Sequence, residues 1–178
     1  MKNIAIKYGV IGGITGIILM LILWFVNAKF FLSYHYYLGA VVIIYFMYKS
    51  AAEVKKANGG YITFGEVFKP LFITFVFGTL IFALFQFLMF NFIDTGLIDL
   101  QKEMAQEAIE KLSQYLDNEE FTEKMQEAID EQNFDMSFFK VMSSWVFSLI
   151  WGAVISLIMS AVMKKNPVPG SELYDSLN

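Results

Sequence analysis

The stretch that decides the fold is residues 70–93, PLFITFVFGTLIFALFQFLMFNFI, which contains no charged residue. The hydrocarbon core of a bilayer is about 30 Å thick and takes about 20 helical residues. This stretch has the length and the apolar character of a membrane-spanning helix. Three more stretches share both properties, namely residues 8–28, 30–48 and 141–163. The sequence therefore predicts an all-α polytopic membrane protein with four transmembrane helices.

The composition supports lipid as the solvent for most of the chain. Hydrophobic residues make up 57% and charged residues 17%, whereas a soluble domain has roughly 45–50% and about 25%. The net charge is −4 and every basic residue is a lysine, so no overall positive field favours nucleic acid. Cysteine is absent, which excludes disulfides and thiolate sites. We expect a single membrane domain over residues 1–178, in contact with the lipid bilayer, with no nucleic-acid partner, cofactor or metal.

The lysines predict the orientation in the membrane. Those at positions 2 and 7, those between residues 49 and 69, and those at positions 164 and 165 fall on one side of a four-span chain. The positive-inside rule makes that side cytoplasmic. Both termini, including the tail of residues 164–178, are then cytoplasmic. The first stretch resembles a signal peptide with a basic start, but its apolar part is longer than a cleaved signal needs, which favours an uncleaved anchor.

The segment of residues 94–140 is acidic and lies between the last two spans. It carries thirteen acids against four lysines. Apolar residues recur every three or four positions in two runs, which predicts a pair of amphipathic helices on the extracytoplasmic side, with an N-cap for the second at residues 117–118. Four glutamates share a helix face and could hold a hard cation or dock a partner (Glu119, Glu120, Glu123 and Glu127). The simpler interpretation, which we favour, is a solvated acidic face.

Polar residues within the four apolar stretches are few. None of the stretches contains Asp, Glu, Lys or Arg, the residues that usually mark transport or catalysis at membrane depth. Gln86 and Asn91 are the candidate intramembrane polar site. We expect them to hydrogen-bond to another helix, with the lining of a substrate path as the alternative. His35, near the outer end of the second stretch, is expected to be interfacial.

Two rows of small residues predict helix packing. Small side chains let two membrane helices approach closely. We expect both rows to face protein rather than lipid, and they can face each other or a second copy of the chain. The first stretch carries Gly9, Gly12, Gly13 and Gly16, and the last carries a small residue at every fourth position, namely Ser144, Ser148, Gly152, Ser156 and Ser160.

Two short segments carry a family resemblance. Residues 59–69, GGYITFGEVFK, and residues 91–94, NFID, resemble segments of the bacterial domain-of-unknown-function 4199 (DUF4199) family, as does the order of spans and acidic loop. The resemblance implies a small four-span protein of the bacterial inner (cytoplasmic) membrane, and it supplies no catalytic residues.

The sequence favours a non-enzymatic membrane interaction or structural component, with a homo-oligomer or another membrane protein as its partner. The alternative is a small oligomeric transporter or channel, with Gln86, Asn91 and the serines of the last span along the path. A membrane enzyme would have only His35, Asp94 and Glu66 near the interface to draw on, and we predict no catalytic residue.

Single cysteines test the orientation directly, because the chain has none of its own. We expect an impermeant thiol reagent to label intact cells at Asn118→Cys, and not at Asn58→Cys or Ser176→Cys. Labelling at the latter two positions and not at Asn118→Cys would invert the topology.

Overall fold

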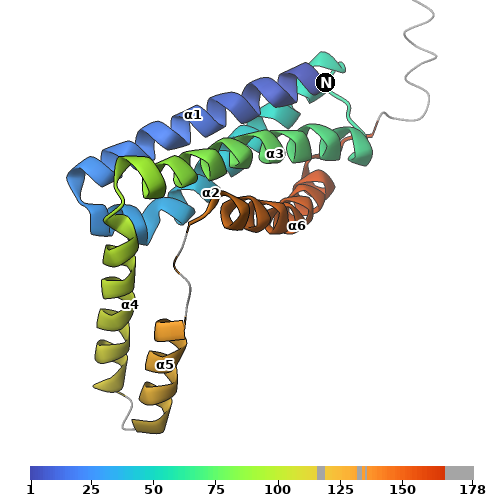
Figure 1. Ribbon diagram of the computed structural model, residues 1–178. Helices are drawn as coiled ribbons and strands as arrows, with labels where there is room; N and C mark the ends of the chain where they lie inside the picture. Colours follow the sequence, from blue (N-terminus) through green and yellow to red (C-terminus); the bar gives the residue numbers. More distant parts are fainter. Residues whose placement is uncertain (116–118, 132–133, 135, 167–178) are drawn as a thin grey trace, which may run out of the picture.

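The computed structural model describes residues 1–115, 119–131, 134 and 136–166, and in them the chain is all-α (Figure 1). The helices are α1 (Lys2–Val26), α2 (Ala28–Ala57), α3 (Phe64–Leu88), α4 (Leu97–Ser113), α5 (Glu119–Glu131) and α6 (Phe138–Met163). A short π-helix, η1 (Met89–Ile93), continues α3. Four of these units are long and apolar enough to cross a membrane, namely α1, α2, α3 with η1, and α6. The protein is therefore a multi-pass membrane protein.

Local sequence signals set the turn between α2 and α3. The helix α2 ends at Ala57, and the chain then passes through Gly59 and Gly60, whose φ angles are 68° and 90°. Glycine adopts such angles without steric cost. The next helix begins after Thr63, whose backbone N–H and hydroxyl donate to the Glu66 carboxylate at 2.8 and 2.9 Å. This capping box places the start of α3 at Phe64, before the apolar stretch that begins at residue 70.

The helix α3 lies at the centre of the bundle. It packs against α1, α2 and α6, and α1 also packs along α2. A close approach joins α1 to α3 at Gly9, where a Cβ atom would lie 2.8 Å from Phe77 Cβ and 2.9 Å from the Thr74 carbonyl oxygen. Across this contact a Cβ on Gly78 would lie 3.2 Å from the Gly9 carbonyl oxygen. The two backbones meet here because neither glycine has a side chain.

The glycine row of α1 packs within the chain. A Cβ on Gly13 would meet Ile81, and one on Gly16 would meet Phe82, both on α3. Gly12 faces α2 instead, where an aromatic ring lies against it. The row therefore serves two neighbouring helices, and α3 is the principal one.

The small-residue row of α6 also approaches α3, but only over part of its length. A Cβ on Gly152 would overlap the ring of Phe75 on α3. Further along α6, Ser156 and Ser160 are fully buried. At the start of the row Ser148 is half-buried and Ser144 is exposed. The rows of α1 and α6 thus share α3 as a neighbour and do not face each other.

The two ends of the bundle differ. The N-terminus, residues 58–63 and the last turn of α6 lie at one end of the bundle, which we call the terminal end. Just past α6, Lys165 forms an isolated β-bridge with Ile62 of the loop. Lys55 also donates to the carbonyl oxygen of Met163 at 3.1 Å. At the opposite end, the hairpin end, the turn between α1 and α2 meets the beginning of α4. The helix α6 is therefore fastened to the rest of the chain at the terminal end.

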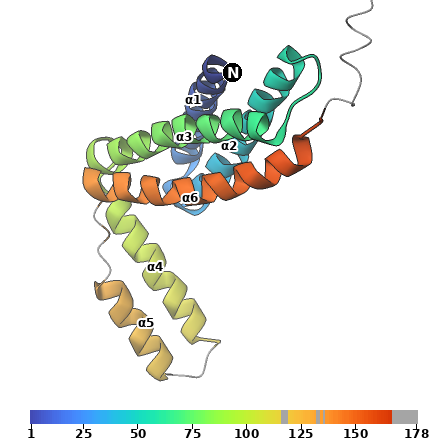
Figure 2. The same ribbon diagram turned by 90° about the vertical axis from the view of Figure 1, so that its right-hand side faces the viewer.

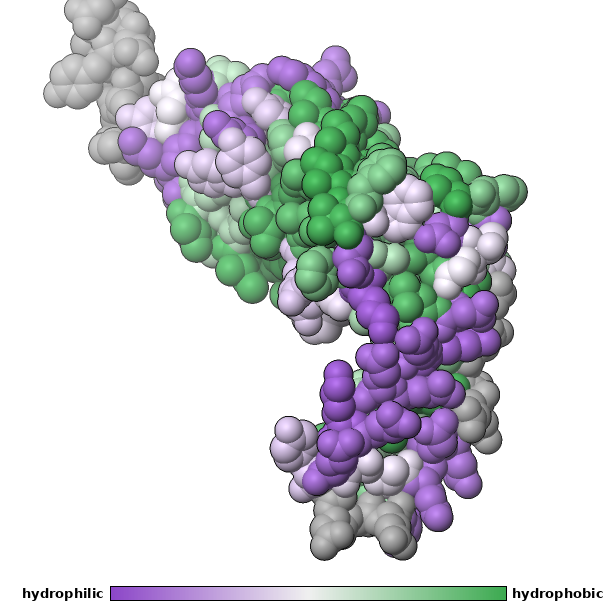
Figure 3. Space-filling view, turned by 90° about the vertical axis from the view of Figure 1, so that its left-hand side faces the viewer, coloured by the Kyte–Doolittle hydropathy of each residue, from purple (hydrophilic) through white to green (hydrophobic). Residues whose placement is uncertain are grey.

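The acidic segment forms two helices, as predicted, and they pack against each other. In two views they run crosswise to the spans and extend past the edge of the bundle (Figures 1 and 2). Leu97 anchors the start of α4, since its side chain is fully buried among residues of α1, α2 and α3. Figure 3 shows hydrophobic surface on the spans between hydrophilic surface at the two ends. This distribution is that of a protein with its spans in lipid and both ends in water.

The close contact at Gly9 predicts how a substitution there changes the stability of the protein. Gly9→Ala is expected to lower the free energy of unfolding by about 1–3 kcal/mol, because the added methyl meets backbone that cannot move aside. Gly65→Ala is the matched control, since a Cβ there meets nothing within 4 Å. It should leave stability unchanged or raise it slightly. Unfolding by denaturing detergent in mixed micelles measures both, and equal stabilities would contradict the packing described.

Candidate functional site

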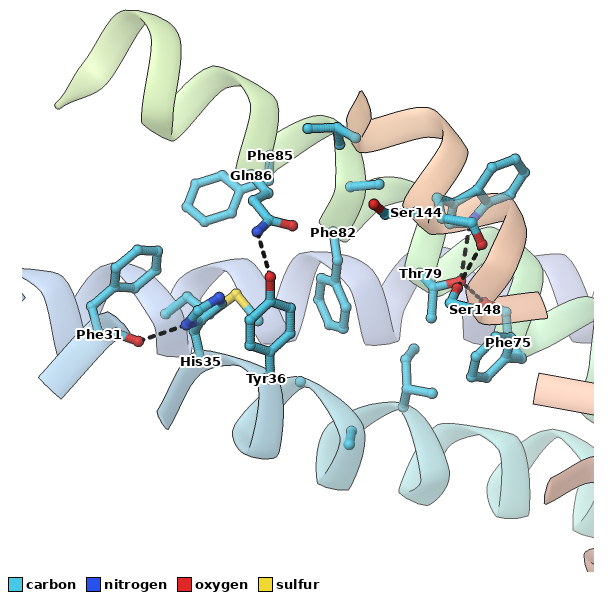
Figure 4. Close-up of a pocket in the computed structure, with 17 residues that line it drawn as sticks. Phe31, His35, Tyr36, Phe75, Thr79, Phe82, Phe85, Gln86, Ser144 and Ser148 are labelled. Carbon is cyan, nitrogen blue, oxygen red and sulfur yellow. Dashed lines mark hydrogen bonds between the residues drawn. The ribbon is translucent and has the colours of Figure 1, made fainter. Parts of the chain in front are cut away.

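A cavity of about 300 Å³ lies between α2, α3 and α6, in the half of the bundle nearer the hairpin end (Figure 4). This volume is at the lower end of the range for ligand pockets, roughly 300–1,000 Å³. Most of its wall is apolar. The lining comprises Met20, Phe31, His35, Tyr36, Gly39, Ala40, Ile43, Phe75, Thr79, Phe82, Ala83, Phe85, Gln86, Val141, Ser144, Trp145 and Ser148.

The cavity follows from the way α6 packs. The helix lies mainly along α3, and its last apolar side chains join a core with α2 residues near the terminal end. Towards the hairpin end the space between α2 and α6 is left to the cavity. Among the lining residues Tyr36, Ala40 and Ser144 are exposed. The cavity therefore opens sideways between α2 and α6, on a surface that faces lipid.

Several polar groups in the cavity are paired across helices. Gln86 on α3 donates from its amide nitrogen to the Tyr36 hydroxyl on α2 at 2.9 Å. Trp145 on α6 donates from Nε1 to the Thr79 hydroxyl oxygen on α3 at 3.2 Å. Thr79 in turn donates to the Phe75 carbonyl oxygen at 2.7 Å. These bonds hold α3 to the helix on each side of the opening.

His35 is the exception to this pairing. Its side chain is buried, with 6% of the residue exposed, and Nδ1 lies 2.9 Å from the Phe31 carbonyl oxygen and 3.1 Å from that of Leu32. Carbonyl oxygens only accept, so Nδ1 carries the hydrogen and Nε2 of the neutral ring is an acceptor. Nε2 has no partner among the described residues. A buried acceptor without a partner typically costs about 1–3 kcal/mol.

Comparison with known protein families agrees with the four-span layout. The model of the family described as "Protein of unknown function (DUF4199)" matches residues 7–165. The chain belongs to the DUF4199 family. No curated protein and no solved structure gives a significant match to this DUF4199 protein. The cavity and the surfaces of the bundle are therefore the features that bear on its function.

Some of the polar residues that the sequence suggested for this DUF4199 protein lie in the cavity, and one lies outside it. Gln86, Ser144 and Ser148 line the same cavity. Asn91 lies outside that lining, in η1, where its amide nitrogen donates to a carbonyl oxygen of α3 at 2.9 Å and to that of Met136 at 2.8 Å. Gln86 thus bonds to another helix, whereas Asn91 ties η1 to the segment that leads into α6.

The structure shows what surrounds the ring of His35. The residue lies near the hairpin end of α2, but its ring is buried beside Phe31 and Tyr36, with ring centroids 5.0 and 3.9 Å away. Its interfacial depth stays a prediction, and the side chain faces protein. One signal in the sequence was available, since Phe31, His35, Gly39 and Ile43 recur every fourth residue and all are buried. Such a spacing indicates a single helix face turned towards protein.

The acidic segment makes contacts that fasten α4 to the bundle. Lys29, at the start of α2, lies 3.2 Å from a Glu103 carboxylate oxygen and 2.7 Å from one of Glu107. The hydrogen bond from Lys29, and then its charge, hold the pKa of Glu107 below its usual value. Nearby, Trp24 donates from Nε1 to Asp94 at 2.9 Å. These bonds join the turn between α1 and α2 to the beginning of the acidic segment.

The glutamates on one face of α5, which the sequence suggested as a possible cation site, do not form a metal site among the described residues. No group of three or more His, Cys, Asp or Glu there is placed to hold a metal ion. Glu120 instead pairs with Lys124 at 2.6 Å. The side chain of Glu119 lies outside the described part of the chain. The solvated acidic face remains the simpler interpretation for the rest of α5.

Proposed function

We propose that the protein is a non-enzymatic membrane component that works by binding, and that its cavity holds part of a membrane lipid. The observation that carries the proposal is the sideways opening of the cavity between α2 and α6, at exposed Tyr36, Ala40 and Ser144. An apolar pocket with a few placed polar groups is the usual form of a small-molecule site. One that opens towards lipid is most easily filled by a lipid chain.

The chemistry of the lining supports binding rather than catalysis. None of the 17 lining residues is an acid or a lysine. Hydrolysis or transfer chemistry needs a nucleophile or an acid–base pair within hydrogen-bond reach. In this cavity Tyr36, Gln86, Thr79 and Trp145 are engaged with one another, which favours a positioning role for them.

The acids considered for an enzyme have other contacts. Asp94 accepts a hydrogen bond from Trp24, and Glu66 accepts two from Thr63 in the capping box of α3. Neither acid lines the cavity that contains His35. The three residues are therefore not placed as one acid–base site, which supports a non-enzymatic role.

We further propose the bacterial cytoplasmic membrane as the location, with both termini in the cytoplasm. The terminal end carries Lys2 and Lys165, and Lys55 and Lys56 lie in the last turn of α2 beside it. A lysine-rich end favours the cytoplasmic side. The cavity would then open into the outer leaflet, on the same side as the acidic helices α4 and α5. The tail beyond residue 166 and two of the three cysteine-labelling positions lie outside the described residues.

A small oligomeric transporter or channel is the second candidate. Gln86, Ser144 and Ser148, which the sequence suggests as lining a path, line one cavity in the structure. The exposed side of α6, with Phe147 and Trp151, offers the surface on which a second copy or another membrane protein would complete such a path. A strictly monomeric protein in lipid would argue against this candidate.

Filling the cavity tests the binding proposal. Ala40→Phe places a ring at the opening from an exposed position, so the fold should tolerate it. Ala161→Phe is the matched control, because Ala161 is also exposed, on α6, and does not line the cavity. Native mass spectrometry of protein released from membranes should show about one retained lipid fewer for Ala40→Phe than for the control and the unaltered protein. Equal retention in all three would contradict the proposal.

A further inference from the structure

The unpaired Nε2 of His35 indicates that the cavity prefers a ligand with a hydrogen-bond donor. Nδ1 is engaged by the Phe31 and Leu32 carbonyl oxygens, so Nε2 can only accept a hydrogen bond in the neutral ring. His35 lines the cavity, and Nε2 has no partner among the described residues. A buried acceptor without a partner calls for an explanation. A ligand that brings a hydrogen-bond donor to this point would supply the missing bond.

The depth of His35 indicates which part of a lipid reaches it. His35 lies six residues from Lys29 along α2, which is about 9 Å at the helical rise of ~1.5 Å per residue. Lys29 sits at the charged hairpin end, where it pairs with Glu103 and Glu107. A point about 9 Å below that charged level lies near the boundary between the headgroups and the hydrocarbon. A lipid's glycerol and ester groups occupy this boundary, and its chains lie deeper.

The neighbours of His35 restrict the headgroup further. The Tyr36 hydroxyl accepts a hydrogen bond from Gln86 and keeps its own hydrogen to donate to an oxygen of a ligand. No lysine or acid among the lining residues could balance a charged headgroup, and an unbalanced charge is costly in such surroundings. The lining therefore fits a neutral headgroup that has a donor and an acceptor close together.

We propose that the cavity binds a neutral lipid with a free hydroxyl, of the diacylglycerol class, whose hydroxyl donates a hydrogen bond to Nε2 of His35. This inference rests on the proposed lipid-binding function and names its ligand. An ester oxygen of the lipid accepts from Tyr36, and one chain lies along Phe75 and Phe82. Nε2 is itself buried in this structure, so the hydroxyl reaches it only if a neighbouring side chain shifts. Met20 lines the same cavity, and a methionine side chain is flexible enough to do so.

A pair of matched photoreactive lipids tests the hydroxyl. One is a diacylglycerol with a diazirine in one chain, and the other is the same molecule with its hydroxyl acetylated. Both are incorporated into nanodiscs with the full-length protein, and labelled peptides are mapped by mass spectrometry. In the unaltered protein we expect the free-hydroxyl probe to label the cavity residues of α3 and α6 about tenfold more than the acetylated probe, the effect of roughly one hydrogen bond.

His35→Phe supplies the decisive variant, because phenylalanine keeps a flat ring and loses the acceptor. Labelling by the free-hydroxyl probe should fall to the level of the acetylated probe, whose own labelling should not change and so reports an intact cavity. Equal labelling by the two probes in the unaltered protein, abolished by Ala40→Phe, would overturn the hydroxyl assignment and leave lipid binding standing. Cavity labelling by neither probe would overturn the assignment of a neutral lipid, and the lipid-retention comparison of Ala40→Phe with Ala161→Phe would then decide whether the cavity binds lipid at all.

Discussion

The structure depends on the close approach of α1 and α3 at Gly9 and Gly78. Within a bilayer, helices gain little from the hydrophobic effect on meeting, because lipid chains are as apolar as their side chains. Association must come from dispersion contacts and a few hydrogen bonds, both of which grow as backbones approach. A Cβ at Gly9 would collide with backbone of α3, so this contact exists only with glycine. Thr74 adds a hydrogen bond of 3.0 Å to the Ala5 carbonyl oxygen nearby.

The arrangement of the remaining spans follows from that contact. With α1 and α2 already packed against α3, α6 takes a further side of it, where Gly152 admits the ring of Phe75. The β-bridge between Ile62 and Lys165 fastens α6 at the terminal end. Towards the hairpin end the cavity occupies the space between α6 and α2. A pocket is thus a consequence of packing a fourth helix mainly against one neighbour.

Much of this fold could be predicted from the sequence, because a membrane span needs only length and apolar character. The four spans, the capping box at Thr63 and the helical pair after Asp94 all follow from local patterns. The N-cap predicted at residues 117–118 lies outside the described residues. The small-residue rows indicated close packing but not its partners, since a glycine does not specify which helix approaches it.

The site was harder to predict, because its lining comes from helices that are far apart in the sequence. Gln86 stood out as a polar residue in an apolar stretch, yet nothing in the sequence distinguished its partner, Tyr36, from the other tyrosines of residues 30–48. The sequence placed His35 near the end of its span without showing whether its ring is exposed or buried. The spacing of Phe31, His35, Gly39 and Ile43 groups them on one face of α2. Which neighbour that face meets depends on how α2 rotates against α3, a property of the assembled bundle.

The most direct test of the central claim, that α6 leaves a lipid-facing cavity beside α2, is the accessibility of nitroxide labels placed singly along residues 144–152 of α6 in bilayers. Labels at 144 and 148 should collide with dissolved oxygen as freely as labels at the exposed positions 147 and 151, while a label at 152, against Phe75, should be protected. Protection at 144 and 148 equal to that at 152 would contradict the account, because α2 or another chain would then cover the opening.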